Sequence, residues 1–308
     1  MIRHTVIIPA YNEAQSVTEL WDRLAPVLDK LGDAEVIWVN DGSTDNTAQA
    51  LDALAAKDAR NIVIHQPRNS GKSAAYTAAF AVIRGDIVFT MDADLQDDPD
   101  ELPAMVAKLA EGFDLVVGYK VGRFKNEPHK RIPSFFFNAM VTRSFGLVLK
   151  DSNCGLRVMK RRVADNLVLY GDLYRFLPQL AHTSGFRVTE IGVKHHARKY
   201  DVSKYGPKRF WTGFLDLLTV RFLTRYREKP LHFFATTAVF PLLGGIGLEV
   251  YVLASKLVGQ TFQEHVAAIV VGATLIMVAG QLAAIGFVAE LISAQLHYVL
   301  HGGPKKPS

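Results

Sequence analysis

The sequence predicts an α/β domain with a mostly parallel, doubly wound sheet, followed by two helices that cross a membrane. Between residues 5 and 117, short apolar runs alternate with segments of helical periodicity. This alternation is typical of parallel strands joined by crossover helices. After Pro230 the chain becomes strongly apolar. We therefore expect the α/β domain over residues 1–206, juxtamembrane amphipathic helices over 207–230, and a two-helix membrane anchor with its tail over 231–308.

Strands are expected where the apolar runs are continuous, because strands of a parallel sheet are buried on both faces. These runs cover residues 5–8, 35–39, 61–65, 87–91 and 114–117. The segments between them, 16–31, 47–57, 69–83 (opened by residues 69–73) and 99–109, show the spacing or composition of helices. Right-handed crossovers bring the carboxyl ends of such strands to one edge of the sheet, where open α/β sheets bind ligands.

Polar residues follow three of the predicted strands: Tyr11-Asn-Glu13, Asp41-Gly-Ser43 and Asp92-Ala-Asp94. One such ending is ordinary turn chemistry. Three endings at the same sheet edge are better explained by a nucleotide site. The segment Asn69-Ser-Gly-Lys72 lacks the spacing of a P-loop, and Lys72 either faces the nucleotide or is solvated.

Asp92 and Asp94 are candidate ligands of a divalent cation, with Gln96 beyond them. Two carboxylates at a sheet edge can share Mg²⁺ or Mn²⁺, which would neutralise a diphosphate leaving group. The competing interpretation is a solvated acidic turn. Only the surrounding motifs favour the metal site over that alternative.

The chain has 308 residues, a formal net charge of +5 and one cysteine, Cys154. A single cysteine excludes an internal disulfide, and a buried core position is favoured over a catalytic role. Five cations between Lys120 and Arg131 precede an apolar run. A solvated face or a nucleic-acid site would be the usual interpretation, but next to a membrane anchor this pattern suits a phosphorylated lipid.

Two apolar runs, 231–255 and 266–291, each exceed the roughly 20 residues that cross a bilayer. Their ionisable residues are His232, Glu249 and Glu290. The basic residues lie before the first run and after the second, so the positive-inside rule places the α/β domain in the cytosol. We expect a multi-pass protein of the inner (cytoplasmic) membrane; two buried helices of a soluble domain are the alternative.

The motifs at 6–14, 39–47 and 92–99 (VIIPAYNEA, VNDGSTDNT and DADLQDDP) resemble those of the inverting GT-A glycosyltransferases of family 2. With its two carboxy-terminal spans, the chain resembles the polyprenyl-phosphate group of that family. This group includes dolichol-phosphate mannose synthase, bactoprenol glucosyltransferases and undecaprenyl-phosphate aminoarabinose transferase. The resemblance implies a Rossmann-like GT-A fold and transfer of a hexose or related sugar from a UDP- or GDP-sugar to a polyprenyl phosphate, undecaprenyl phosphate being expected. It implies a role in modifying cell-envelope glycans, no nucleic-acid partner, and a homo-oligomer, a tetramer in relatives.

The resemblance also implies roles for individual residues. Asp94, Asp151 and Asp172 are catalytic candidates. Alternatively, Asp151 would only cap a turn, and Asp172 would be a helix-start carboxylate favoured by the helix dipole. The nucleotide would be bound by Pro9, Tyr11, Glu13, Asp41, Lys72, Asp92, Arg198 and Lys204. The metal ion would be held by Asp92, Asp94 and Gln96. The acceptor phosphate would be bound by Lys120, Arg123, Arg131 and Ser134. A processive polysaccharide synthase and a non-catalytic nucleotide-sugar sensor are the alternative functions. The Gln-X-X-Arg-Trp element of the former is not found in the sequence.

Overall fold

The computed structural model describes residues 3–121, 139–196, 199, 218–222, 226 and 229–301, with side chains to residue 295. Two compact units divide the chain, Met1–Leu217 and Leu218–Ser308. Most of the predicted juxtamembrane segment, 207–230, lies outside the described residues. The predicted three-part division therefore stays a prediction.

The first unit contains a mixed, mostly parallel sheet of the kind that the sequence predicts. Its strands follow the order β3-β2-β1-β4-β6-β5-β7, and β6 runs antiparallel to both of its neighbours. The strands are β1 (His4–Ala10), β2 (Ala34–Asn40), β3 (Asn61–His65), β4 (Ile87–Thr90), β5 (Leu115–Lys120), β6 (Arg157–Lys160) and β7 (Val188–Val193). The first five coincide with the predicted runs to within a few residues, whereas β6 and β7 were not predicted.

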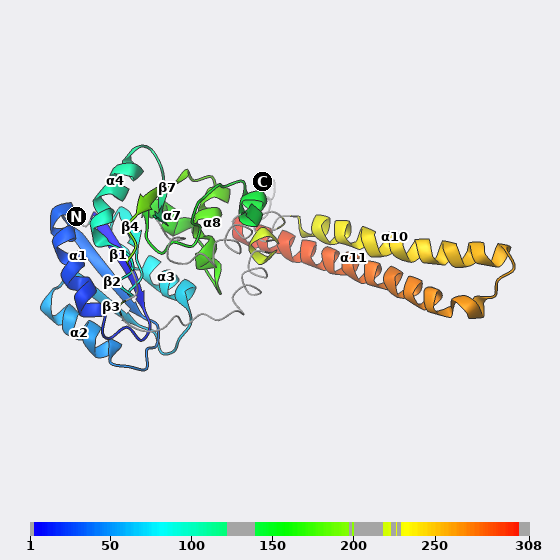
Figure 1. Cartoon of the computed structure of the whole chain (residues 1–308), viewed down its shortest axis with the longest axis horizontal. Coiled ribbons are helices and arrows are strands. Elements are labelled where there is room, and N and C mark those ends of the chain that lie inside the picture. Colours follow the sequence, from blue (N-terminus) through cyan, green and yellow to red (C-terminus); the bar gives the residue numbers. More distant parts are fainter. Residues whose placement is uncertain are drawn as a thin grey trace, which may run out of the picture. The chain divides into compact units, whose positions relative to one another are not determined.

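Helices cover both faces of this sheet. Figure 1 shows α1 and α2 on one side of β1–β3 and α3 on the other, as a doubly wound topology requires. The helices of the unit are α1 (Val17–Leu31), α2 (Thr47–Lys57), α3 (Lys72–Phe80), α4 (Leu102–Ala110), α7 (Arg161–Asn166) and α8 (Leu177–Thr183), with short 3₁₀ turns η1 (Pro99–Glu101) and η3 (Leu173–Phe176). The helix predicted to open within 69–73 and run to residue 83 begins at Lys72 and ends earlier, at Phe80. The one predicted at 99–109 begins with η1.

The core lies where the predicted periodicities place it. Every residue of β1 and β2 is buried, as expected for strands covered on both faces. The apolar stripe of α1 is buried against the sheet, including Leu20 and Leu24. Parallel pairing of β1 with β2 and β4 brings the carboxyl ends of these three strands together.

The second unit is an antiparallel hairpin of two long helices, α10 (Pro230–Leu257) and α11 (Val266–His301), joined through the turn η4 (Phe262–His265) (Figure 1). Both helices are long and apolar enough to cross a membrane. Large apolar side chains such as Leu243 and Val250 are exposed along them. This exposure disfavours the alternative of buried helices in a soluble domain.

Small residues let the two helices of the hairpin approach closely. A Cβ on Gly245 would lie 2.7 Å from the carbonyl oxygen of Gly272, and a Cβ on Gly272 would lie 2.6 Å from Glu249 Oε1. Glu290 accepts a hydrogen bond from the backbone N–H of Leu231 at 3.0 Å. The intramembrane acids predicted from the sequence thus face the partner helix, where a polar group is less costly than in lipid.

Candidate functional site

Two strand-end loops are tied together by hydrogen bonds. The N–H of Asn12 donates to Ser43 Oγ (3.0 Å), and the N–H of Thr44 donates back to Asn12 Oδ1 (2.8 Å). The N–H of Glu13 donates to Thr47 Oγ1 (2.8 Å). Asn12 has a φ of 55°, a left-handed conformation that asparagine tolerates better than most residues. The motifs after β1 and β2 therefore form one rigid wall, as their position at a common sheet edge predicts.

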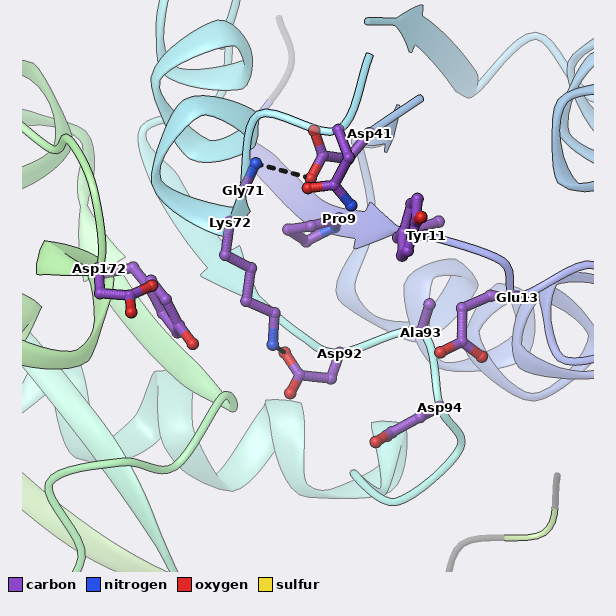
Figure 2. Close-up of a pocket in the computed structure, with 13 residues that line it drawn as sticks. Pro9, Tyr11, Glu13, Asp41, Gly71, Lys72, Asp92, Ala93, Asp94 and Asp172 are labelled. Carbon is purple, nitrogen blue, oxygen red and sulfur yellow. Dashed lines mark hydrogen bonds and ion pairs between the residues drawn. The ribbon is translucent and has the colours of Figure 1, made fainter. Parts of the chain in front are cut away.

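Asp41 holds a third loop against this wall. Its two carboxylate oxygens accept hydrogen bonds from the N–H groups of Ser70 (2.7 Å) and Gly71 (2.9 Å). Figure 2 shows the contact with Gly71. The neighbouring Gly42 has a φ of 65°, and a Cβ there would lie 2.3 Å from the backbone carbon of Arg68. Only glycine lets the backbone at position 42 come this close to Arg68. This close packing fixes where α3 begins. Asp41 thus positions the start of α3 and also lines the pocket described below.

Lys72, the first residue of α3, reaches across the site to Asp92 (Figure 2). Its Nζ lies 2.7 Å from Asp92 Oδ1. Burial alone would raise the pKa of Asp92, but Lys72, Lys120 and Arg157 together lower it. Burial alone would lower the pKa of Lys72, but Asp92 and two nearby tyrosines raise it. Both partners are therefore charged at neutral pH. The sequence suggested that Lys72 either faces the nucleotide or is solvated. The structure instead pairs Lys72 with Asp92.

Gly155 packs against the Asp92 carboxylate. A Cβ at position 155 would lie 2.7 to 2.9 Å from the three carboxylate atoms of Asp92. Thr90, at the end of β4, donates its hydroxyl to the Gly155 carbonyl at 2.8 Å. The loop before β6 is thereby anchored to the same strand that leads to Asp92. Glycine is needed at position 155 of the Cys154-Gly-Leu-Arg157 segment because a side chain there would overlap the Asp92 carboxylate.

The loop after β4 turns sharply at Leu95. This residue is buried and has a φ of 62°, unusual for a branched side chain. Asp94 Oδ1 accepts from the N–H of Gln96 at 3.2 Å. Further along, His196 contacts Asp98 Oδ2 at 2.9 Å and donates its backbone N–H to the Gln96 carbonyl at 2.8 Å. These contacts fix the conformation in which Asp92 and Asp94 both line the pocket.

The opposite wall of the pocket comes from the segment around η3. Asp172 lines the pocket, makes no side-chain cap to η3, and lies 3.2 Å from Arg175 Nη2. The N–H of Tyr174 donates to Ser73 Oγ at 3.1 Å, which attaches this segment to α3. The ring centroid of Tyr174 lies 5.6 Å from Lys72 Nζ. Asp172 directly precedes η3, which is the position that the helix-start alternative gives it, and its side chain makes no capping hydrogen bond there.

The pocket gathers all six nucleotide candidates that lie among the described residues. Its lining residues are Pro9, Ala10, Tyr11, Glu13, Asp41, Asn69, Gly71, Lys72, Asp92, Ala93, Asp94, Asp172 and Tyr174 (Figure 2). Among these, Ala10, Asn69, Gly71, Ala93 and Tyr174 were not predicted as site residues. Asn69 and Gly71 belong to a segment that the sequence had already singled out, and the aromatic position of the 171–178 segment was the available signal for Tyr174.

Some predicted site residues do not line the pocket, and others lie outside the described residues. Gln96, Lys120 and Asp151 are described but do not line the pocket. Arg123, Arg131, Ser134, Arg198 and Lys204 lie outside the described residues. Asp151 is buried, and its Oδ1 accepts from the N–H of Asn153 at 3.2 Å, which is the turn-capping contact of the alternative interpretation.

Cys154 is fully buried beside the site rather than in it. Its side chain has no exposed surface, and burial raises the pKa of the thiol well above its ordinary value. Reactive cysteines have lowered pKa values and accessible sulfurs. The structure therefore agrees with a core role for Cys154.

The donor set of the pocket fits a magnesium or manganese ion that is completed by substrate. No group of three His, Cys, Asp or Glu side chains arranged for metal binding occurs within the described part of the chain. Mg²⁺ sites at phosphate substrates commonly use only one or two carboxylates, with phosphate oxygens and water as the other ligands. Asp92 and Asp94 supply such a pair, and the Lys72 ammonium shows that the Asp92 carboxylate already attracts a cation.

Comparison with known proteins identifies the family. The model of glycosyl transferase family 2 matches residues 5–168. A dodecaprenyl-phosphate galacturonate synthase of Rhizobium johnstonii is 32% identical over 302 residues, covering 94% of this chain and 87% of that protein. An undecaprenyl-phosphate 4-deoxy-4-formamido-L-arabinose transferase of Pseudomonas fluorescens is 37% identical over 237 residues, covering 76% and 69%.

Solved structures show the same fold. Glucosyl-3-phosphoglycerate synthase of Mycobacterium tuberculosis, in complex with Mn²⁺, UDP-glucose and phosphoglyceric acid, superimposes with a TM-score of 0.54 at 22% identity, covering 71% of this chain and 80% of that one. This likeness confirms the predicted GT-A-like sheet. The family match and the relatives named above show that the chain is a glycosyltransferase and belongs to glycosyl transferase family 2.

Proposed function

We propose that this chain transfers a hexose or related sugar from a UDP- or GDP-sugar to a polyprenyl phosphate, undecaprenyl phosphate above all, with inversion at the anomeric carbon. The observation that carries the proposal is one pocket lined by all three strand-end motifs, in a chain that also has two membrane-length helices. The curated relatives are polyprenyl-phosphate sugar transferases by name. We place the catalytic unit in the cytosol, attached to the inner membrane, because the basic flanks of the spans favour that orientation.

In the proposed reaction, a phosphate oxygen of the lipid attacks the anomeric carbon on the face opposite the diphosphate. A phosphate monoester is largely ionised near pH 7, so a strong general base is not required. This agrees with the absence of Asp151 from the pocket lining. Catalysis would come mainly from positioning two anionic substrates and stabilising the departing diphosphate.

Named residues divide this work. Pro9, Tyr11, Glu13 and Asp41 would hold the base and ribose. Asp92, Asp94 and Gln96 would hold Mg²⁺ or Mn²⁺, which when bound would neutralise the diphosphate. Lys72 lies between this acidic loop and the Asp172–Tyr174 wall. Asp172 would contact sugar hydroxyls or the acceptor phosphate. Lys120, with the basic residues at 123 and 131 and Ser134, would bind the lipid phosphate, and Arg198 and Lys204 the donor.

The test is an assay of the full chain in detergent with undecaprenyl phosphate, Mg²⁺ or Mn²⁺ and a panel of radiolabelled UDP- and GDP-sugars. We expect one donor to give a chelator-sensitive product in the lipid extract that carries a single sugar. Asp94→Ala should abolish transfer and leave the protein folded. A polymeric product would favour a processive synthase, and donor binding without any transfer would favour a sensor. Either result would overturn the proposal.

A further inference from the structure

The Lys72–Asp92 ion pair places a protein cation on a carboxylate that the proposed reaction assigns to a divalent cation. The two side chains are 26% and 28% exposed, and both line the pocket. Gly155 packs against the Asp92 carboxylate, which limits the space available to it. Because Lys72 Nζ already lies 2.7 Å from Asp92 Oδ1, Lys72 and a metal ion would compete for this carboxylate.

We propose that Lys72 is an exchangeable counter-ion: it holds Asp92 until a divalent cation takes this carboxylate, and the released ammonium then serves the anionic diphosphate of the donor. The inference rests on the proposed function, because it requires that Asp92 and Asp94 bind the cation. It adds an order of events in which cation binding frees the positive charge that the nucleotide needs. Lys72 is thus assigned two partners, used in succession.

The surroundings of Lys72 suit such an exchange. Its position is fixed at the start of α3 by the Asp41 contacts to Ser70 and Gly71, so only the flexible side chain has to move. The Tyr174 ring, with its centroid 5.6 Å from Nζ, offers the ammonium a second favourable contact within the pocket. Among the described residues, Lys72 is the cation paired directly with Asp92, so its removal would take away the charge that competes most closely with a metal ion.

The first experiment measures Mn²⁺ binding to the full chain in detergent by electron paramagnetic resonance, without substrate. Lys72→Gln should bind Mn²⁺ about tenfold more tightly than the wild type, because a competing charge is lost. Lys108→Gln is the matched control. Lys108 also pairs with a carboxylate, Glu111 at 2.6 Å, but does not line the pocket, so this variant should bind as the wild type does. Unchanged or weaker binding by Lys72→Gln would overturn the exchange.

The second experiment follows Lys72 itself, by acetylation with an excess of an acetyl ester and mass spectrometry of the digested chain. Saturating Mn²⁺ should increase acetylation of Lys72 several-fold and leave that of Lys108 unchanged. Addition of UDP or GDP should then protect Lys72. In Asp92→Asn, Lys72 should react rapidly even without Mn²⁺. The inference would be overturned if acetylation of Lys72 did not change with Mn²⁺, or if neither UDP nor GDP protected Lys72 from acetylation in the presence of Mn²⁺.

Asp94→Asn separates this inference from the proposed function. If Mn²⁺ binds the wild type but not Asp94→Asn, the metal site stands, and unchanged Lys72 reactivity would overturn the exchange alone. If Mn²⁺ binds neither protein, or both equally well, the proposed metal site fails and the exchange fails with it.

Discussion

Gly155→Ala tests whether Asp92 must lie where the structure places it. The new Cβ would lie 2.7 Å from Asp92 Oδ1 and 2.8 Å from its Cγ. Ordinary non-bonded contacts are near 3.5 Å, so the carboxylate must retreat by about 0.5 to 1 Å. The backbone of Gly155 cannot retreat as easily, because its carbonyl accepts the Thr90 hydroxyl.

This displacement should cost activity much more than stability. The moving group is the end of a side chain that borders the pocket, so the free energy of unfolding should change by less than about 1.5 kcal/mol. A misplacement of this size in a catalytic constellation costs roughly tenfold to a hundredfold in rate. The assay is the initial rate with the best donor of the panel, measured alongside thermal unfolding and Mn²⁺ affinity.

Gly247→Ala is the control, because a Cβ there meets no atom within 4 Å. It should leave transfer unchanged. Wild-type rate and Mn²⁺ affinity in Gly155→Ala would refute the reasoning. So would a loss of activity that is accompanied by an equal loss of the thermal transition, since the change would then be a general folding defect.

Three further predictions concern other parts of the chain. Burial would raise the pKa of Asp114, but the Arg187 N–H and the Arg162 and Lys160 side chains lower it below its ordinary value. The contribution of ionised Asp114 to the free energy of unfolding is therefore fully present above about pH 4. It is lost as the pH falls through the folded-state pKa. Asp114→Asn should cost about 2 kcal/mol in the free energy of unfolding at pH 7 and reduce the loss of stability on acidification, measured by denaturant titration. Cys154 should react with a maleimide only after unfolding, and Cys154→Ala should retain transfer; labelling of the native protein would contradict its burial. Gly245→Leu should separate α10 from α11, because even a Cβ at this position would lie 2.7 Å from the backbone carbonyl oxygen of Gly272, and limited proteolysis should then cleave the anchor faster than in the wild type.

The sequence predicts the first five strands because their apolar runs are continuous. β6 escapes prediction because it is short and contains Arg157, whose side chain is nevertheless buried. β7 carries Glu190 and is mostly half-buried, so its pattern is weak. Both strands depend on pairing with β5, which lies at least 37 residues from β6 along the chain. Local patterns carry no signal for such pairing.

The site shows the same division between local and distant information. The motifs ending β1, β2 and β4 are predictable because parallel topology brings them to one edge. The Lys72–Asp92 pair is not, because it depends on where α3 begins, and the Asp41 contacts to a loop about 30 residues away decide that. Tyr174 reaches the pocket through its contact with Ser73, 101 residues earlier in the chain.

The charge of the pocket explains why these separate features belong together. Five acidic residues line it, Glu13, Asp41, Asp92, Asp94 and Asp172, and among the lining residues only Lys72 is basic. Asp41 is satisfied by backbone N–H groups, Asp92 pairs with Lys72 and Asp172 with Arg175. Five carboxylates against one lysine in the lining still disfavour binding of a nucleoside diphosphate. A donor can therefore bind well only when positive charge is added on the acidic side, which is what a divalent cation at Asp92 and Asp94 would supply. Lys72 could not meet this need while paired with Asp92, since its charge is then already neutralised. Binding of the cation and release of Lys72 therefore both add positive charge to the pocket, and together they favour binding of the donor diphosphate.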